Sequence, residues 1–161
     1  MRRRARGFTL VELITTMILI GILSAVAIPR LSGTSSFSER GFRDGVFTAL
    51  SHARRVAVAS RRFVCVSITS SIVTVTRDLG TNPEAAASVS CTAPVPLPGA
   101  GSGCSANAVC APNGVAAGGT AIVVFDPLGR SITTPNTVAP ATVTISNQAD
   151  ITVAAETGYV Q

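Results

Sequence analysis

The sequence contains no lysine and no tryptophan, and it has one histidine and one tyrosine. Charged residues make up only 13% of its 161 residues, and all thirteen basic residues are arginine. Because His52 is the lone histidine and no nucleophile is placed beside it by spacing, no catalytic constellation can be recognised. We therefore expect neither an enzymatic activity nor a cofactor.

The net charge of +5 belongs mostly to the N-terminus, because four of the thirteen arginines lie within the first six residues. Without them, nine arginines face eight acidic residues, which leaves a net charge of +1. Past Arg77 the one basic residue is Arg130. Proteins that bind nucleic acid cluster basic residues on the binding surface, so nucleic acid is not an expected partner.

A long apolar run, from Phe8 to Ile28, contains a single charged residue, Glu12. As a helix it would measure roughly 31 Å, about the thickness of the hydrocarbon core of a bilayer. Arginines precede the run and none lies within it, a pattern that places the N-terminus in the cytoplasm. The sequence therefore predicts one transmembrane helix over residues 8–28, with everything after Pro29 on the other side.

Two general explanations of this N-terminus leave Glu12 unexplained. A secretory signal peptide fits the basic start and an A-x-A site at 24–27, and a plain membrane anchor fits the length. In either case a carboxylate within an apolar helix costs roughly 1–3 kcal/mol unless it has a partner.

A more specific pattern is Gly7-Phe8-Thr9-Leu10-Val11-Glu12 behind a short basic leader. It resembles the N-terminus of type IV pilins and of the pseudopilins of type II secretion. The resemblance implies that a prepilin peptidase removes a leader of residues 1–7, cutting between Gly7 and Phe8, and that Phe8 is then N-methylated. It also implies that Glu12 pairs with the terminal amine of a neighbouring subunit, because two buried opposite charges are tolerable together and costly apart.

All four cysteines follow the apolar run, which favours two disulfides in an oxidising compartment. Their spacings do not match a zinc site, so no metal is expected. Three pairings are open, of which Cys65–Cys91 with Cys104–Cys110 closes the smallest loops and is preferred.

Residues 29–62 predict a helical spine outside the cytoplasm. The polar run at 32–36 predicts a break, with helix resuming near Ser38 and continuing to about Arg61. Residues at steps of three or four predict a buried stripe: Phe42, Val46, Leu50, Ala53, Ala57 and Ser60. The arginines beside the stripe form a solvated face or contact acids on adjacent subunits; they are Arg43, Arg54, Arg55, Arg61 and Arg62.

Residues 63–161 predict an antiparallel β-sheet head, which makes the fold class α+β. Strands are expected at 63–68, 72–76, 120–125, near 131–133, and at 141–146 and 150–154, which pair across a turn at 147–148. The interval 78–119 is rich in Ala, Gly, Pro and Ser and predicts a long loop that the disulfides tie to the sheet.

The second half sharpens the resemblance. The turn FDPLGR and the terminal TGYV resemble the class that contains the H-type pseudopilin, and residues 38–67 resemble a minor pilin of the mannose-sensitive haemagglutinin pilus. This implies a minor pilin of the inner membrane with a periplasmic head, which joins other pilin subunits in a fibre and supports assembly or adhesion. A pseudopilin of type II secretion and a tip module that binds DNA or surfaces are the alternatives.

Overall fold

The computed structural model describes residues 9–31, 34–80, 88–99, 103–135 and 137–161. The chain divides into two units, residues 1–36 and 37–161, and each is described by itself. The first contains helix α1 (Leu10–Leu31), and helix α2 (Thr34–Ser60) runs into the second. Helix α2 begins earlier than the expected Ser38, because serine and threonine are well tolerated at the start of a helix.

Helix α2 buries one stripe against the strands, as predicted. Phe42, Val46, Leu50, Ala53 and Ala57 are at most 3% exposed. Ala49 joins this stripe, whereas Ser60 at its predicted end is only half-buried. The stripe packs against the inward side chains of the strands and forms the main hydrophobic core.

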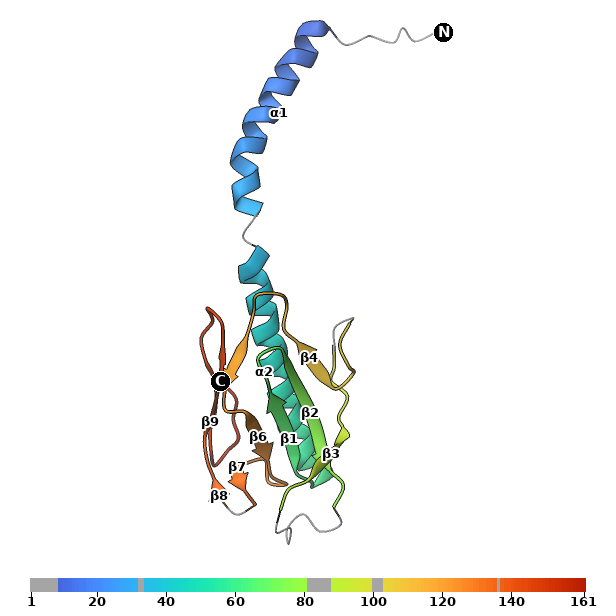
Figure 1. Cartoon of the computed structure of the whole chain (residues 1–161), viewed down its shortest axis with the longest axis vertical. Coiled ribbons are helices and arrows are strands. Elements are labelled where there is room, and N and C mark those ends of the chain that lie inside the picture. The colour runs from blue at the N-terminus through green and yellow to red at the C-terminus, as the bar shows by residue number, and fades with distance from the viewer. Residues whose placement is uncertain (1–8, 32–33, 81–87, 100–102, 136) are drawn as a thin grey trace, which may run out of the picture. The chain divides into compact units, whose positions relative to one another are not determined.

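The larger sheet has seven antiparallel strands (Figure 1). They run in the order β3-β2-β1-β6-β7-β8, with β4 also paired to β2. The strands are β1 (Val64–Ile68), β2 (Ile72–Asp78), β3 (Cys91–Pro94), β4 (Ala108–Cys110), β6 (Ile122–Phe125), β7 (Ser131–Thr134) and β8 (Thr137–Val138). The β1–β2 hairpin and β7 match the prediction closely, while β6 begins two residues after the expected start.

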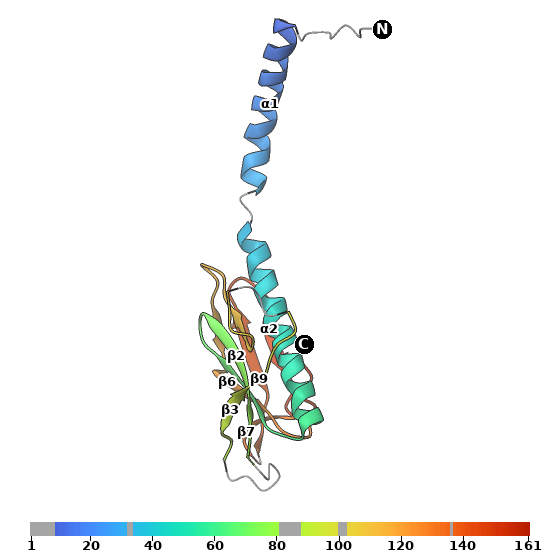
Figure 2. The same ribbon diagram turned by 90° about the vertical axis from the view of Figure 1, so that its right-hand side faces the viewer.

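A second sheet has three strands in the order β10-β9-β5. They are β5 (Ala117–Gly119), β9 (Ala141–Ile145) and β10 (Ile151–Val153). The C-terminus lies along β10, where Thr152 and Gln161 exchange two backbone hydrogen bonds of 2.8 and 2.9 Å. Figure 2 shows α2 covering one face of the strands, so the head is a helix packed on antiparallel sheets, the expected α+β fold.

The predicted loop at 78–119 is wrong in its main feature, because β3, β4 and β5 lie within it. These strands have three or four residues and consist largely of Ala, Gly, Cys and Pro, so they lack the β-branched alternation that marks a strand. Their positions come from pairing with β2 and β9.

Candidate functional site

The N-terminal turn of α1 holds the predicted assembly residue, Glu12. The predicted cleavage residues, Gly7 and Phe8, lie outside the described residues. The Thr9 side-chain oxygen accepts a hydrogen bond from the Glu12 backbone N–H at 3.3 Å, and the Thr9 carbonyl accepts one from the Leu13 N–H at 3.2 Å. Thr9 is therefore the N-cap of α1, and Glu12 stands three residues later, where a carboxylate faces the positive end of the helix dipole.

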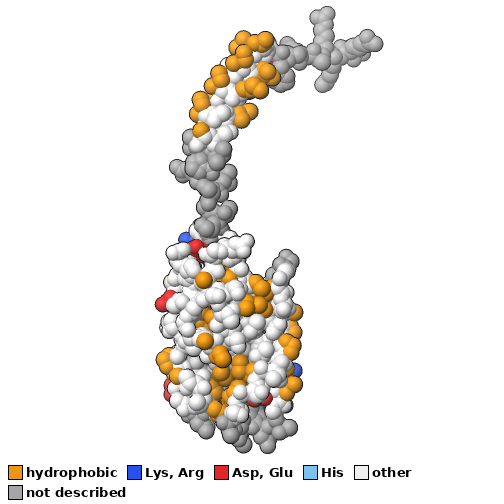
Figure 3. Space-filling view, viewed as in Figure 1, with side chains coloured by type: hydrophobic (Ala, Val, Ile, Leu, Met, Phe, Trp, Pro, Cys, Tyr) orange, Lys and Arg blue, Asp and Glu red, His pale blue; other side chains and the backbone are white. Residues whose placement is uncertain are grey.

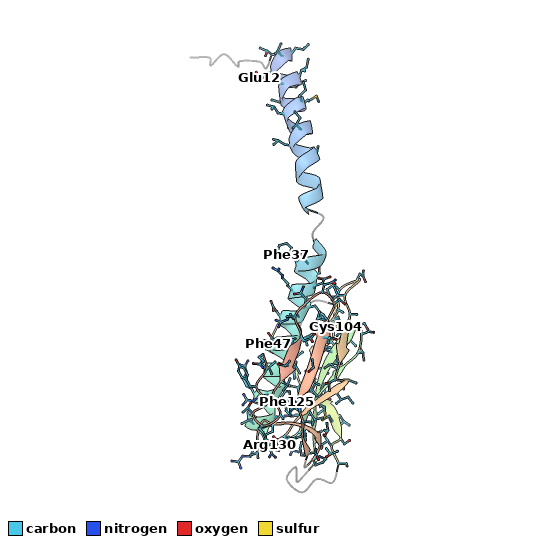
Figure 4. The ribbon with its side chains drawn as sticks, turned by 90° about the vertical axis from the view of Figure 1, so that its left-hand side faces the viewer. Glu12, Phe37, Phe47, Cys104, Phe125 and Arg130 are labelled. Carbon is cyan, nitrogen blue, oxygen red and sulfur yellow. A yellow bond between two sulfur atoms is a disulfide. The ribbon has the colours of Figure 1, made fainter. Side chains whose placement is uncertain are left out.

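The rest of the described surface of α1 is apolar. The hydroxyl groups of Thr15, Thr16 and Ser24 donate to carbonyls of their own helix, which removes them as external hydrogen-bonding groups. Large apolar side chains project all round the helix (Figure 4); between 48% and 74% of each is exposed: Leu10, Val11, Leu13, Ile14, Met17, Ile18, Leu19, Ile20, Ile22 and Leu23. Within the described residues, no helix combines the length and the hydropathy needed to cross a membrane.

A polar edge of α2 fastens the head to its helix. Glu39 is 8% exposed and accepts hydrogen bonds from the Asn147 and Gln148 side-chain amides at 3.0 and 3.4 Å. The Arg43 Nε donates to the Ala149 carbonyl at 2.8 Å. Glu39 and Arg43 therefore hold the turn between β9 and β10 against the helix.

Arg54 lies further along the same edge of α2. Its Nε donates to the Thr157 carbonyl at 2.9 Å and to the Gly129 carbonyl at 3.3 Å. Arg43 and Arg54 were expected to be solvated or to contact acids on adjacent subunits; they instead bind backbone carbonyls of their own head. The sequence held no signal for this, because a carbonyl acceptor belongs to every residue type.

Two glycines let the FDPLGR turn and the TGYV terminus meet beside Arg54. Gly129 and Gly158 have φ angles of 83° and 58°, which favour glycine. A Cβ on Gly158 would lie 1.9 Å from the Gly129 carbonyl oxygen, and a Cβ on Gly129 would lie 2.8 Å from Cγ2 of Val58. The two sequence motifs are thus halves of one close-packed junction on α2.

The charge on Arg130 is paired within that turn. Asp126 is 2% exposed and accepts hydrogen bonds from the backbone N–H groups of Leu128 and Arg130 at 3.0 and 2.8 Å. Its other oxygen accepts one from the Arg130 Nε at 2.7 Å. Arg130 is therefore committed to shaping the turn, which weakens the case for binding DNA there.

Both disulfides pair as the loop lengths favoured. Cys65–Cys91 joins β1 to β3, and Cys104–Cys110 closes the loop before β4. Among the described residues, no group of His, Cys, Asp or Glu is arranged to hold a metal ion.

The head has two hollows. A groove of about 620 Å³ lies between α2 and the segment around the Cys104–Cys110 disulfide. A cleft of about 580 Å³ lies on the outer face of the seven-stranded sheet, where Figure 3 shows apolar side chains gathered. The described residues lining this cleft include neither charged nor aromatic side chains: Cys65, Ser67, Thr76, Ser88, Val89, Cys91, Ile122, Val124, Ile132, Thr133, Thr134 and Pro135.

Comparison with known proteins places the two parts of the chain separately. The family model of the prokaryotic N-terminal methylation motif matches residues 2–28. Two crystal structures of the type IV minor pilin FimU of Pseudomonas aeruginosa strain PAO1 are similar to this chain at 14% sequence identity. One match covers 76% of this chain and 90% of FimU with a TM-score of 0.50, and the other covers 80% and 90% with a TM-score of 0.51. At this identity the likeness shows a shared fold, and no curated protein matches the sequence.

The close approach at Gly158 gives the first testable prediction. We expect Gly158→Ala to lower the free energy of unfolding by about 1–3 kcal/mol more than Gly114→Ala. Both glycines have positive φ, so both substitutions strain the backbone, but a Cβ on Gly114 meets nothing within 4 Å. Thermal unfolding of the full chain in detergent, followed by circular dichroism, measures the difference. Equal losses would contradict the close packing of the two turns.

Proposed function

We propose that this chain is a minor type IV pilin. A prepilin peptidase removes residues 1–7 at the cytoplasmic face, and the new N-terminal Phe8 is methylated. Residues 8–28 hold the subunit in the inner membrane with the head in the periplasm, and the same helix then packs among those of other pilin subunits in the fibre. The methylation motif over residues 2–28 and the minor-pilin fold of the head support this proposal.

The observation that carries the proposal is the surface of α1. Its described side chains expose one acid, Glu12, beside a wall of large apolar groups. Such a surface needs apolar surroundings, such as lipid or neighbouring helices. The head meanwhile completes its own hydrophobic core, so it does not need α1 to fold.

The absence of lysine narrows the partner of Glu12. The N-terminal amine is the single ammonium group in the chain, because every basic side chain is a guanidinium. An amine–carboxylate pair between two copies must therefore use that terminus. Cleavage after Gly7 would create the amine four residues before Glu12, and methylation would keep its positive charge.

The resemblance of residues 38–67 supports a finer assignment, to the mannose-sensitive haemagglutinin type of pilus, with a role in assembly or adhesion. A second candidate is a pseudopilin of type II secretion. The observation that favours it is the junction of FDPLGR with TGYV on α2, because these are the motifs that resemble the H-type pseudopilin. The uncharged cleft on the outer sheet face leaves a role in surface binding as a third function to test.

Processing at Gly7 is tested by Gly7→Ala. We expect the variant to keep its leader and therefore four additional arginines, which raises the net charge from +1 to +5. Isoelectric focusing and N-terminal sequencing of membrane fractions measure this directly. A wild-type protein that begins at Ile28 would instead show cleavage of a secretory signal after Ala27.

The assembly role of Glu12 is tested by Glu12→Leu, with Met17→Leu as the matched control on the same helix. We expect the Glu12 variant to be processed and inserted normally, yet to appear in sheared fibres at a level about tenfold lower or less. The neighbour's buried amine would then lack a partner, and breaking a buried ion pair typically costs several kcal/mol. Equal amounts of both variants in the fibre fraction would refute the pairing.

A further inference from the structure

The outward face of α2 carries an unexplained row of exposed side chains. Phe37 is 77% exposed, and the Asp44 side chain is also 77% exposed. Thr48 and Arg55 are exposed as well. At about 100° per residue these four lie within about 40° of one another, on the side of the helix opposite its buried stripe. Figure 4 shows Phe37 pointing away from the strands.

This row has a charge and an aromatic group that the head itself does not use. Arg55 hydrogen-bonds only through Nε, to the Ser51 carbonyl of its own helix, among the contacts the structure describes. Asp44 lies 3.9 Å from Arg43, whose Nε is already committed to the Ala149 carbonyl. An exposed phenylalanine is a common anchor of protein interfaces.

Beside the row lies the 620 Å³ groove. Its helix side is formed by Gly41, Gly45 and Thr48, and Leu97 and Val109 form part of the opposite wall. A Cβ on Gly41 would meet nothing within 4 Å, so this glycine leaves open space. The groove is therefore an apolar hollow next to Thr48, large enough to admit an aromatic ring.

We propose that α2 of one copy packs along α2 of a second copy, parallel and staggered by eleven residues. Phe37 of the first copy then lies beside Thr48 and the groove of the second. The same stagger brings Asp44 of the first copy beside Arg55 of the second. Eleven residues correspond to a shift of about 16 Å along the helix. One displacement thus satisfies the charge pair and the aromatic anchor together.

Other alignments satisfy fewer of these groups. A parallel contact without stagger would place Asp44 against Asp44 and Arg55 against Arg55, and like charges oppose binding. An antiparallel contact would pair Asp44 with Arg55 but place Phe37 beside Arg62, away from the groove. The staggered contact uses different patches on the two copies, so it is heterologous and can continue from copy to copy.

This inference rests on the proposed function for the parallel direction, since copies inserted in one membrane share their orientation. It also extends that function, because it assigns the head a contact of its own with a second copy. Charge complementarity between exposed groups contributes specificity more than affinity. The groove and Phe37 would supply most of the buried apolar area.

The test uses two full-length chains with different tags, one with Phe37→Cys and the other with Thr48→Cys, expressed together. The four native cysteines are in disulfides, so the introduced thiols are the reactive ones. We expect oxidation or a short thiol cross-linker to produce a species that carries both tags. The control pair is Phe37→Cys with Ala59→Cys, because Ala59 is exposed and lies within one turn of the antiparallel position.

A charge exchange tests direct contact. Asp44→Arg in the Phe37→Cys chain, or Arg55→Asp in the Thr48→Cys chain, should lower the cross-linked yield by about two- to fivefold, as expected for an exposed ion pair. The two changes together, one on each chain, should restore it. Arg40→Asp in the Phe37→Cys chain is the matched control, because Arg40 is exposed on α2 and lies off the row.

The fibre and membrane fractions are scored separately. A chain that reaches sheared fibres without a Phe37–Thr48 link overturns this contact and leaves the proposed function standing. A chain absent from fibres but linked at Phe37–Thr48 in membranes overturns the proposed function and leaves the contact standing. A link at Ala59 in place of Thr48, or a link from Thr48→Cys to another protein alone, overturns the contact as well.

Discussion

An ionised carboxylate is stable in apolar surroundings only when an opposite charge or hydrogen-bond donors accompany it, and Glu12 makes this constraint unavoidable for α1. The helix supplies part of the answer itself. Thr9 caps its first turn, and Glu12 stands three residues after the cap, near the positive end of the dipole. These groups soften the cost of the acid before any partner arrives. A cation from a neighbouring subunit would complete the pairing, and with lysine absent the terminal amine is the ammonium group that can do so.

Helix α2 divides its circumference among three tasks. One stripe is buried and forms the core with the strands. An adjoining edge, with Glu39, Arg43 and Arg54, binds the turns that connect the C-terminal strands. The remaining face exposes Phe37 and a separated pair of opposite charges, which are available to a second copy. Since the first two tasks are complete within one head, the third face can change its partners without unfolding the protein.

The sequence predicted those parts of the fold in which local pattern and tertiary position agree. The stripe from Phe42 to Ala57 repeats at helical spacing, and the β1–β2 and β9–β10 pairs are rich in β-branched residues. Strands β3 to β5 escaped because short segments such as Ala117–Gly119 owe their conformation to their partners. The resemblance supplied Glu12, but the Arg54 junction could not be foreseen, because it joins a helix to carbonyls 75 and 103 residues away.

The central claim is that Glu12 of one copy lies against the terminal amine of the next. A water-soluble carbodiimide tests it directly, because the reagent joins a carboxylate and a nearby amine in an amide bond with loss of water. Fibres would be prepared from a mixture of isotopically light and heavy full-length chains, cross-linked, digested and examined by mass spectrometry. The account predicts mixed light–heavy peptides that join Glu12 to Phe8 and that disappear in Glu12→Gln. The absence of such mixed peptides from wild-type fibres would contradict it.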